Sequence, residues 1–221
     1  MTPRQLPLDL PHTPSFERED FLESPANAEA LRAIAAWPNW AGGMLLLIGP
    51  AGSGKSHLGA IWARASGAAV AAAAALPPAA LSAPALLIEN ADRIGANEAS
   101  LFHLINGARE AGASLLLTAR AAPGAWGLST PDLTSRLRLA PIARLREPDE
   151  DLARAVLFKL FADRQLAVDP SVIAYIALRI ERSLGAARAI VEALDREGLA
   201  RGRAVTRAMA GEVLGRAGRG E

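Results

Sequence analysis

The chain has 221 residues, enough for one α/β domain with a small helical addition, and its 51% hydrophobic and 21% charged residues are ordinary for a folded soluble protein. Its formal net charge is +1, so no global charge excess marks a nucleic-acid-binding protein, and the absence of cysteine excludes disulfides and thiolate metal sites. No secretory signal opens the sequence and no apolar run reaches membrane-spanning length, which predicts a cytoplasmic protein without a membrane partner.

The first fifteen residues are rich in proline and leucine and lack a helical period, which predicts an extended tail over residues 1–15. Ser24 and Pro25 then favour the start of a helix, with the serine as N-cap and the proline as the first helical residue. We expect this helix to continue through Ala35.

Short apolar runs alternate with helical segments in the next hundred residues. Strands are predicted at Met44–Ile48, Ala68–Ala75, Ala85–Ile88, Ser114–Leu117 and Pro141–Leu145, with helices at Lys55–Ala65 and Asn97–Ala111. The alanine-rich second strand is the weakest of these, because alanine also permits helix. Buried strands that alternate with helices predict a parallel sheet flanked by helices, in an α/β domain over residues 16–147.

The pattern changes after Pro148, where predicted strands stop and helical periodicity continues. Helices are predicted at Asp149–Arg164, Pro170–Arg182, Leu184–Gly198 and Val205–Arg216. We therefore predict a small all-helical lid subdomain over residues 148–221.

A phosphate-loop motif follows the first predicted strand. Gly49 to Ser56 match G-x-x-x-x-G-K-[ST], in which glycines let backbone N–H groups surround phosphate oxygens at the positive end of a helix. Lys55 would reach the β- and γ-phosphates, and the Ser56 hydroxyl would bind Mg²⁺. The sequence therefore predicts ATP or ADP as ligand. The predicted nucleotide-binding residues are Gly49, Pro50, Ala51, Gly52, Ser53, Gly54, Lys55, Ser56 and His57, the last of which also suits a packing role.

A second motif lies at the end of the third predicted strand, where Glu89 and Asn90 follow an apolar run in the form of a Walker B motif. Glu89, together with Ser56, would hold the magnesium ion. ATPases with a Walker B motif that hydrolyse ATP actively generally have a second carboxylate at the next position. Here that position is Asn90, whose amide cannot accept a proton. We therefore expect tight nucleotide binding with slow intrinsic ATP hydrolysis at most.

With these motifs in place, residues 16–214 resemble the AAA+ module of the bacterial replication initiator DnaA and its homologues, the DnaA/Hda family. Gly54–Leu58, with the sequence Gly-Lys-Ser-His-Leu, is similar to the continuation of that family's P-loop. Asp132–Leu137 is similar to its arginine-finger segment, so the resemblance implies that Arg136 is the catalytic finger. It also implies an AAA+ α/β fold with a helical lid.

The resemblance extends to two sensor positions. Ala187–Ala189 is similar to the sensor 2 segment, which makes Arg188 a candidate phosphate contact. The polar sensor 1 residue of the family aligns with Leu117–Arg120, where either Thr118 serves or the sensor is lost.

The tail is similar to the short peptides that dock on the bacterial sliding clamp, with Gln5, Leu6, Leu8 and Leu10 as the contacting residues. The sequence ends at residue 221, shortly after the predicted helices, so we expect no helix-turn-helix domain and no sequence-specific DNA binding. Clamp-binding members of the family promote hydrolysis of ATP on DnaA. The resemblance therefore implies a replication regulator whose partners are the clamp and DnaA, with Arg136 acting in trans.

Two other functions stay open. A helicase loader also has a DnaA-like AAA+ module, but it would bind single-stranded DNA with strong salt dependence and would not need the tail peptide. A P-loop kinase for small molecules would need an acceptor pocket and further lid arginines, for which Arg188 alone is thin support. A homodimer is an open alternative to a monomer.

Overall fold

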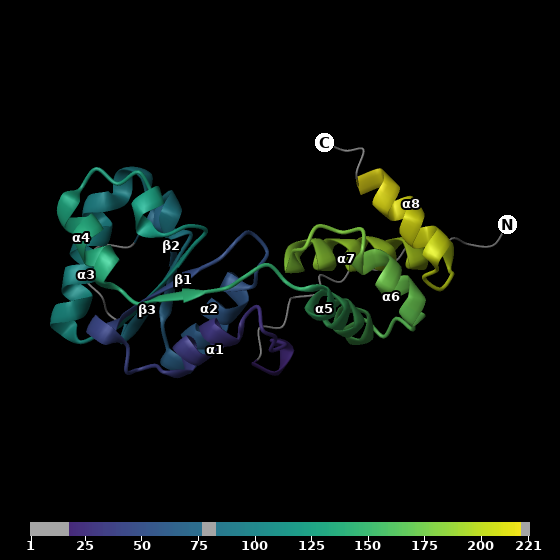
Figure 1. Ribbon diagram of the computed structural model, residues 1–221, viewed down its shortest axis with the longest axis horizontal. Coiled ribbons are helices and arrows are strands. Elements are labelled where there is room, and N and C mark those ends of the chain that lie inside the picture. Colours follow the sequence, from purple (N-terminus) through teal and green to yellow (C-terminus); the bar gives the residue numbers. More distant parts are fainter. Residues whose placement is uncertain (1–17, 77–82, 218–221) are drawn as a thin grey trace. The chain divides into compact units, whose positions relative to one another are not determined.

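The computed structural model describes residues 18–76 and 83–217, apart from the side chains of Glu19 and Ala217 (Figure 1). The predicted tail, including its clamp-binding residues, lies outside the described residues. The chain divides into two compact units between Glu147 and Pro148. Of the helices described, none is long and apolar enough to cross a lipid bilayer.

The first unit is built on a parallel sheet with the strand order β2-β3-β4-β1-β5 (Figure 1). The strands are β1 (Met44–Ile48), β2 (Ala69–Ala72), β3 (Ala85–Glu89), β4 (Ser114–Ala119) and β5 (Ile142–Arg144). The predicted parallel sheet is confirmed, although β2 is shorter than expected because Ala73–Ala75 form a 3₁₀ helix. The carboxyl ends of β1, β3 and β4 meet at one edge, where open parallel sheets bind ligands.

Helices cover both faces of this sheet (Figure 1). They are α1 (Ala28–Ala35) and α2 (Lys55–Ser66) on one face, and α3 (Glu98–Ala111) and α4 (Pro131–Leu139) on the other. Strand alternation divides the core accordingly, since Leu45 packs in the cluster that contains Trp62 of α2, and Leu46 in the cluster that contains Leu104 of α3. Both faces of β1, β3 and β4 are buried, as their continuous apolar runs predict, whereas the edge strand β2 is mostly exposed.

The first helix begins later than predicted. Helix α1 starts at Ala28 rather than at Pro25, because a turn over Ser24 to Asn27 precedes it. The Ser24 N–H donates to Asn27 Oδ1 at 2.9 Å, and Asn27 Nδ2 donates to the Leu22 carbonyl at 2.8 Å. The buried Asn27 side chain thus holds the chain out of the helix at the position where a serine N-cap was expected.

Helix α4 was not predicted from periodicity. It is nine residues long with Pro131 at its start, and its buried residues are Leu133 and Leu137. Its third leucine, Leu139, is exposed and falls outside the spacing of the two buried ones, so the sequence shows no clear helical period. Packing against α3 and the sheet stabilises this helix, because both leucines belong to the same core cluster as α3.

The second unit is all-helical. It contains α5 (Glu150–Asp163), α6 (Pro170–Ala177), α7 (Leu184–Arg201) and α8 (Arg207–Ala217), packed around a core of its own that includes Phe161, Ile176 and Val191. Helix α6 ends at Ala177 rather than at the predicted Arg182, because the chain turns where the Arg179 N–H donates to the Ile176 carbonyl at 2.8 Å.

Candidate functional site

The P-loop lies between β1 and α2, at the carboxyl edge of the sheet. Gly52 and Gly54 have φ angles of 68° and 100°, in the left-handed region that favours glycine. A Cβ at Gly49 would lie 2.7 Å from the Leu145 carbonyl oxygen and 2.7 Å from Ser53 Oγ, so no larger residue fits there. The loop is therefore closed tightly around its own backbone, at the start of a helix whose first N–H groups have no partner within the helix.

Lys55 directs its ammonium group into this loop. Its Nζ donates to the carbonyls of Gly49 at 2.7 Å and Pro50 at 2.6 Å, and the residue is buried. Burial lowers the pKa of Lys55, as does the positive charge of Arg120 to a smaller extent, while Asp92 acts in the opposite direction. The buried ammonium group of Lys55 would therefore attract an anion bound in the loop strongly.

Two further polar atoms at this edge lack partners. Ser53 Oγ and Asp92 Oδ1 are buried and make no hydrogen bond within residues 18–76 and 83–217. Ser53 is a hydroxyl donor lying beside Gly49, inside the loop, which fits a phosphate oxygen. The loop residues therefore fit a bound polyphosphate.

The residues expected to hold magnesium lie at the same carboxyl edge of the sheet as this loop. Ser56 is exposed in the first turn of α2, and Glu89 is the half-buried last residue of β3. The described residues contain no cluster of three or more histidine or acidic ligands. A single carboxylate with one hydroxyl suits Mg²⁺ that takes its remaining ligands from phosphate and water.

Asn90 and Thr118 connect the ends of β3 and β4. Asn90 adopts a left-handed conformation with φ 55°, and its N–H donates to Thr118 Oγ1 at 3.1 Å. Thr118 is buried, so its hydroxyl serves this structural bond. His57 is also buried, and its ring packs edge-on against Phe21 with centroids 5.3 Å apart. The structure thus gives Asn90 a bridging contact and His57 a packing contact. The roles of these two residues toward a nucleotide stay predictions.

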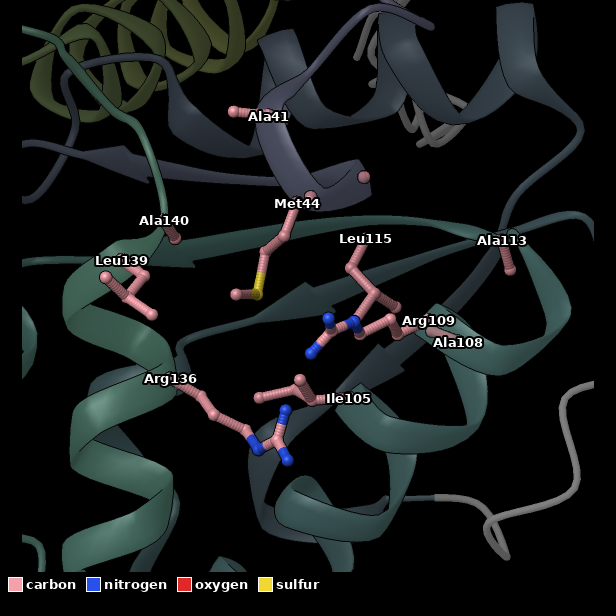
Figure 2. Close-up of a pocket in the computed structure, with 12 residues that line it drawn as sticks. Ala41, Met44, Ile105, Ala108, Arg109, Ala113, Leu115, Arg136, Leu139 and Ala140 are labelled. Carbon is pink, nitrogen blue, oxygen red and sulfur yellow. The ribbon is translucent and has the colours of Figure 1, made fainter.

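Arg136, in the middle of α4, lines a pocket at the opposite edge of the sheet. Its guanidinium stands 5.4 Å from the centre of the Phe102 ring, and the pocket has a volume of about 300 Å³. Figure 2 shows the Arg109 side chain of α3 near Met44 and Leu115, and the Arg136 side chain of α4 extending toward Ile105. Because Met44 begins β1 and the P-loop follows its last residue, Ile48, the two edges are about 13 Å apart.

Arg188, the predicted sensor 2 residue, belongs to the helical unit near the start of α7. Burial lowers its pKa, with a further contribution from the positive charge of Arg164. Arg164 itself forms an ion pair with Asp195 at 3.7 Å. The phosphate contact of Arg188 stays a prediction.

Glu98 is a residue that sequence reasoning missed. It stands at the start of α3 and accepts hydrogen bonds from the backbone N–H groups of Ser129 at 3.0 Å and Thr130 at 2.8 Å, and from the Ser129 hydroxyl at 3.1 Å. These contacts tie α3 to the segment that leads into α4 and Arg136. The polar Thr130 before Pro131 indicates a helix start. No local pattern, however, indicates that Glu98 contacts residues about thirty positions further along the chain.

We expect Glu98→Gln to destabilise the protein at neutral pH. The Ser129 backbone hydrogen bond, with the Thr130 contacts, lowers the pKa of Glu98 from 4.5 to about 2. A depressed carboxyl pKa stabilises the fold above pH 4.5, and this contribution is lost as the pH falls from 4.5 toward 2. The Tm difference between wild type and variant should thus be largest near pH 7 and vanish near pH 2.

The matched control for this prediction is Glu110→Gln, an exposed carboxylate near the other end of α3. Its Tm should follow that of the wild type throughout. An equal Tm for Glu98→Gln and wild type at pH 7 would contradict a stabilising role of the Glu98 carboxylate.

Comparison with known proteins bears on the fold. No protein-family model and no curated protein matches this chain. Domain III of the replication initiation protein DnaA of Thermotoga maritima matches with a TM-score of 0.80 and 19% identity, over 94% of this chain and 98% of that chain. The chain has a DnaA-like AAA+ fold.

Other AAA+ structures are similar over smaller parts. AMPPCP-bound DnaA of Aquifex aeolicus matches with a TM-score of 0.68 and 13% identity, over 81% of this chain and 65% of that chain. The RuvB Holliday junction branch migration motor of Thermotoga maritima matches with a TM-score of 0.63 and 17% identity, over 78% of this chain and 61% of that chain. The parallel sheet with its flanking helices and the helical C-terminal part are those of the AAA+ fold.

Proposed function

We propose that this protein is a cytoplasmic regulator of replication initiation of the Hda type. It binds ATP or ADP at its P-loop, docks on the sliding clamp through its N-terminal tail and stimulates hydrolysis of the ATP held by DnaA. Its AAA+ fold, its P-loop geometry and the position of Arg136 support this function.

The position of Arg136 carries the proposal. Its pocket opens at the amino edge of the sheet, whereas the P-loop of the same unit lies at the carboxyl edge. An arginine that lines a pocket at the edge opposite its own P-loop serves a nucleotide held by another molecule better than its own. An arginine supplied in this way stabilises the charge on the phosphoryl group during transfer.

Nucleotide binding is proposed from the loop itself. Lys55, the loop backbone and Ser53 would hold the phosphates, and a phosphate contact of Arg188 is proposed from the family resemblance alone. Magnesium, when bound to Ser56 and Glu89, would neutralise charge on the phosphate oxygens. Two of the similar structures are of DnaA bound to AMPPCP, an observation on those proteins that agrees with a nucleotide site here.

Slow turnover of the protein's own nucleotide follows from Asn90. An amide cannot take a proton from the attacking water, and Asn90 is held by its backbone bond to Thr118. A protein that keeps its own nucleotide suits a regulator whose arginine acts elsewhere.

Turnover of DnaA-bound ATP, measured with clamp loaded on DNA, tests this function. Addition of the protein should raise the rate of ATP hydrolysis, and the increase should require the clamp. An unchanged rate would remove the regulatory assignment, and salt-sensitive binding of single-stranded DNA in its place would favour a helicase loader.

Clamp binding gives a separate prediction for the tail. The double substitution Gln5→Ala, Leu6→Ala should abolish capture of the protein on immobilised clamp, because it removes an amide hydrogen bond and an apolar anchor. Thr13→Ala, in the same tail but outside the peptide, is the matched control and should bind as wild type. Equal capture of the double variant and the wild type would show that the peptide is not the docking element.

A further inference from the structure

The pocket beside Arg136 lies at the amino edge of the sheet, where β5 is too short to cover β1. Strand β5 pairs with β1 only from Leu46 onward, whereas Met44 pairs with Leu115 of β4 on the other side. The first residues of β1 therefore lack a neighbouring strand on one side. The space left there has a volume of about 300 Å³, and the 3₁₀ helix Ala41–Gly43, α3 and the end of α4 border it.

The floor of this pocket is apolar. Met44 and Leu115 lie at the start of β1 and β4, Ile105 and Ala108 belong to α3, and all four are buried in one core cluster. The end of α4 adds Leu139, whose side chain is 84% exposed. Such a lining favours a ligand with an apolar body, because that body would leave water for contact with these side chains.

Two arginines from different helices supply the charge of the pocket. Arg109 lies in the last turn of α3, and Arg136 of α4 stands 5.4 Å from the centre of the Phe102 ring. Among the pocket residues that the structure describes, only these two carry a charged side chain. Both border the apolar floor, Arg109 beside Met44 and Arg136 toward Ile105 (Figure 2).

Neither guanidinium group has an anionic partner in the described parts of the chain. The side chains of Arg109 and Arg136 form no ion pair and no hydrogen bond there, although Asp132 stands one helical turn before Arg136. Two positive charges that line one pocket repel each other, and an anion bound between them would offset this repulsion. An apolar cavity with a few polar groups is also the usual composition of a small-molecule site.

We propose that this pocket binds a free organic acid. The apolar body of the acid lies against the floor, and its carboxylate accepts hydrogen bonds from Arg109 and Arg136, since a guanidinium matches a carboxylate through two parallel N–H···O bonds. A carboxylate suits this pocket better than a phosphate dianion, because a second charge beside an apolar floor costs more free energy to remove from water.

This site is separate from the P-loop, which lies at the carboxyl edge of the sheet. It gives a role to Arg109, which has none in the proposed function. Binding of the acid requires neither a nucleotide nor DnaA.

Calorimetric titration with hydrocinnamate tests the site. Hydrocinnamamide, which keeps the apolar body without the charge, and acetate, which keeps the carboxylate without the body, are the matched probes. We expect hydrocinnamate to bind with a Kd on the order of 0.1 mM, and each of the other two at least about 10-fold more weakly.

Arg109→Ala should weaken hydrocinnamate binding by on the order of 10-fold, because one of two charged hydrogen-bond donors is lost, and Arg109→Lys should retain part of the affinity. Arg109 is exposed and unpaired in the described chain, so the Tm of both variants should equal that of wild type. Arg138→Ala, exposed on α4 but not among the pocket residues, is the matched control and should bind as wild type.

Four results would overturn the proposal. The first is no heat from wild type at millimolar hydrocinnamate, and the second is equal affinity for hydrocinnamate and either matched probe. The third is unchanged affinity in Arg109→Ala, and loss in Lys55→Ala alone would place the probe in the P-loop. The fourth is binding of a capped leucine–glutamate dipeptide in place of hydrocinnamate, which would assign the pocket to a partner protein. ATP and ADP titrations and the DnaA turnover assay test the proposed function separately.

Discussion

Replacing Lys55 by alanine is expected to weaken the binding of both ATP and ADP by on the order of 100-fold. The ammonium group lies inside the P-loop, 2.7 Å from the Gly49 carbonyl and 2.6 Å from the Pro50 carbonyl. Its burial means that little water screens its attraction for a phosphate. Calorimetry with each nucleotide in the presence of Mg²⁺ measures the effect.

The second lysine of the chain provides the matched control. Lys159 forms an ion pair with Asp163 at 3.1 Å on the surface of α5, and Lys159→Ala should leave nucleotide affinity unchanged. Because Lys55 also bonds the loop backbone, the Tm of Lys55→Ala without nucleotide shows how far the loop depends on it. Full affinity in a folded Lys55→Ala protein would refute the nucleotide site.

Replacing Arg136 by alanine is expected to lower the stimulated hydrolysis of DnaA-bound ATP by on the order of 1,000-fold, or to the rate of DnaA alone if that is reached first. The guanidinium would no longer stabilise charge on the transferred phosphoryl group of the partner's ATP. The variant's own nucleotide affinity should not change, because the Arg136 pocket and the P-loop lie at opposite edges of the sheet.

Arg138→Ala is the control here too, since Arg138 is exposed on the same helix two residues further on. Single-turnover hydrolysis of labelled ATP on DnaA, with clamp loaded on DNA, compares the variants. A rate with Arg136→Ala equal to that of wild type would show that Arg136 is not the finger, even if the protein still stimulates DnaA.

Sequence patterns predicted the strands more closely than the helix ends. The run Met44–Ile48 is apolar throughout because both faces of β1 are covered, so its bounds could be read directly. The start of α1 was misplaced because the Asn27 side chain, which bonds Ser24 and Leu22, stabilises a turn instead. Helix α4 was missed because only Leu133 and Leu137 of it are buried.

Local sequence was sufficient to predict a glycine-rich loop between a strand and a helix at residues 49–56, and the nucleotide-binding role of these residues stays a prediction. The distant contacts required the folded chain. Parallel pairing of β1 with β4 brings the Ala119 carbonyl to the Gly49 N–H at the start of the P-loop, and packing of α3 near α4 brings Glu98 to Ser129. Such contacts depend on the order and register of the strands in the whole sheet. No short pattern of residues encodes that order and register.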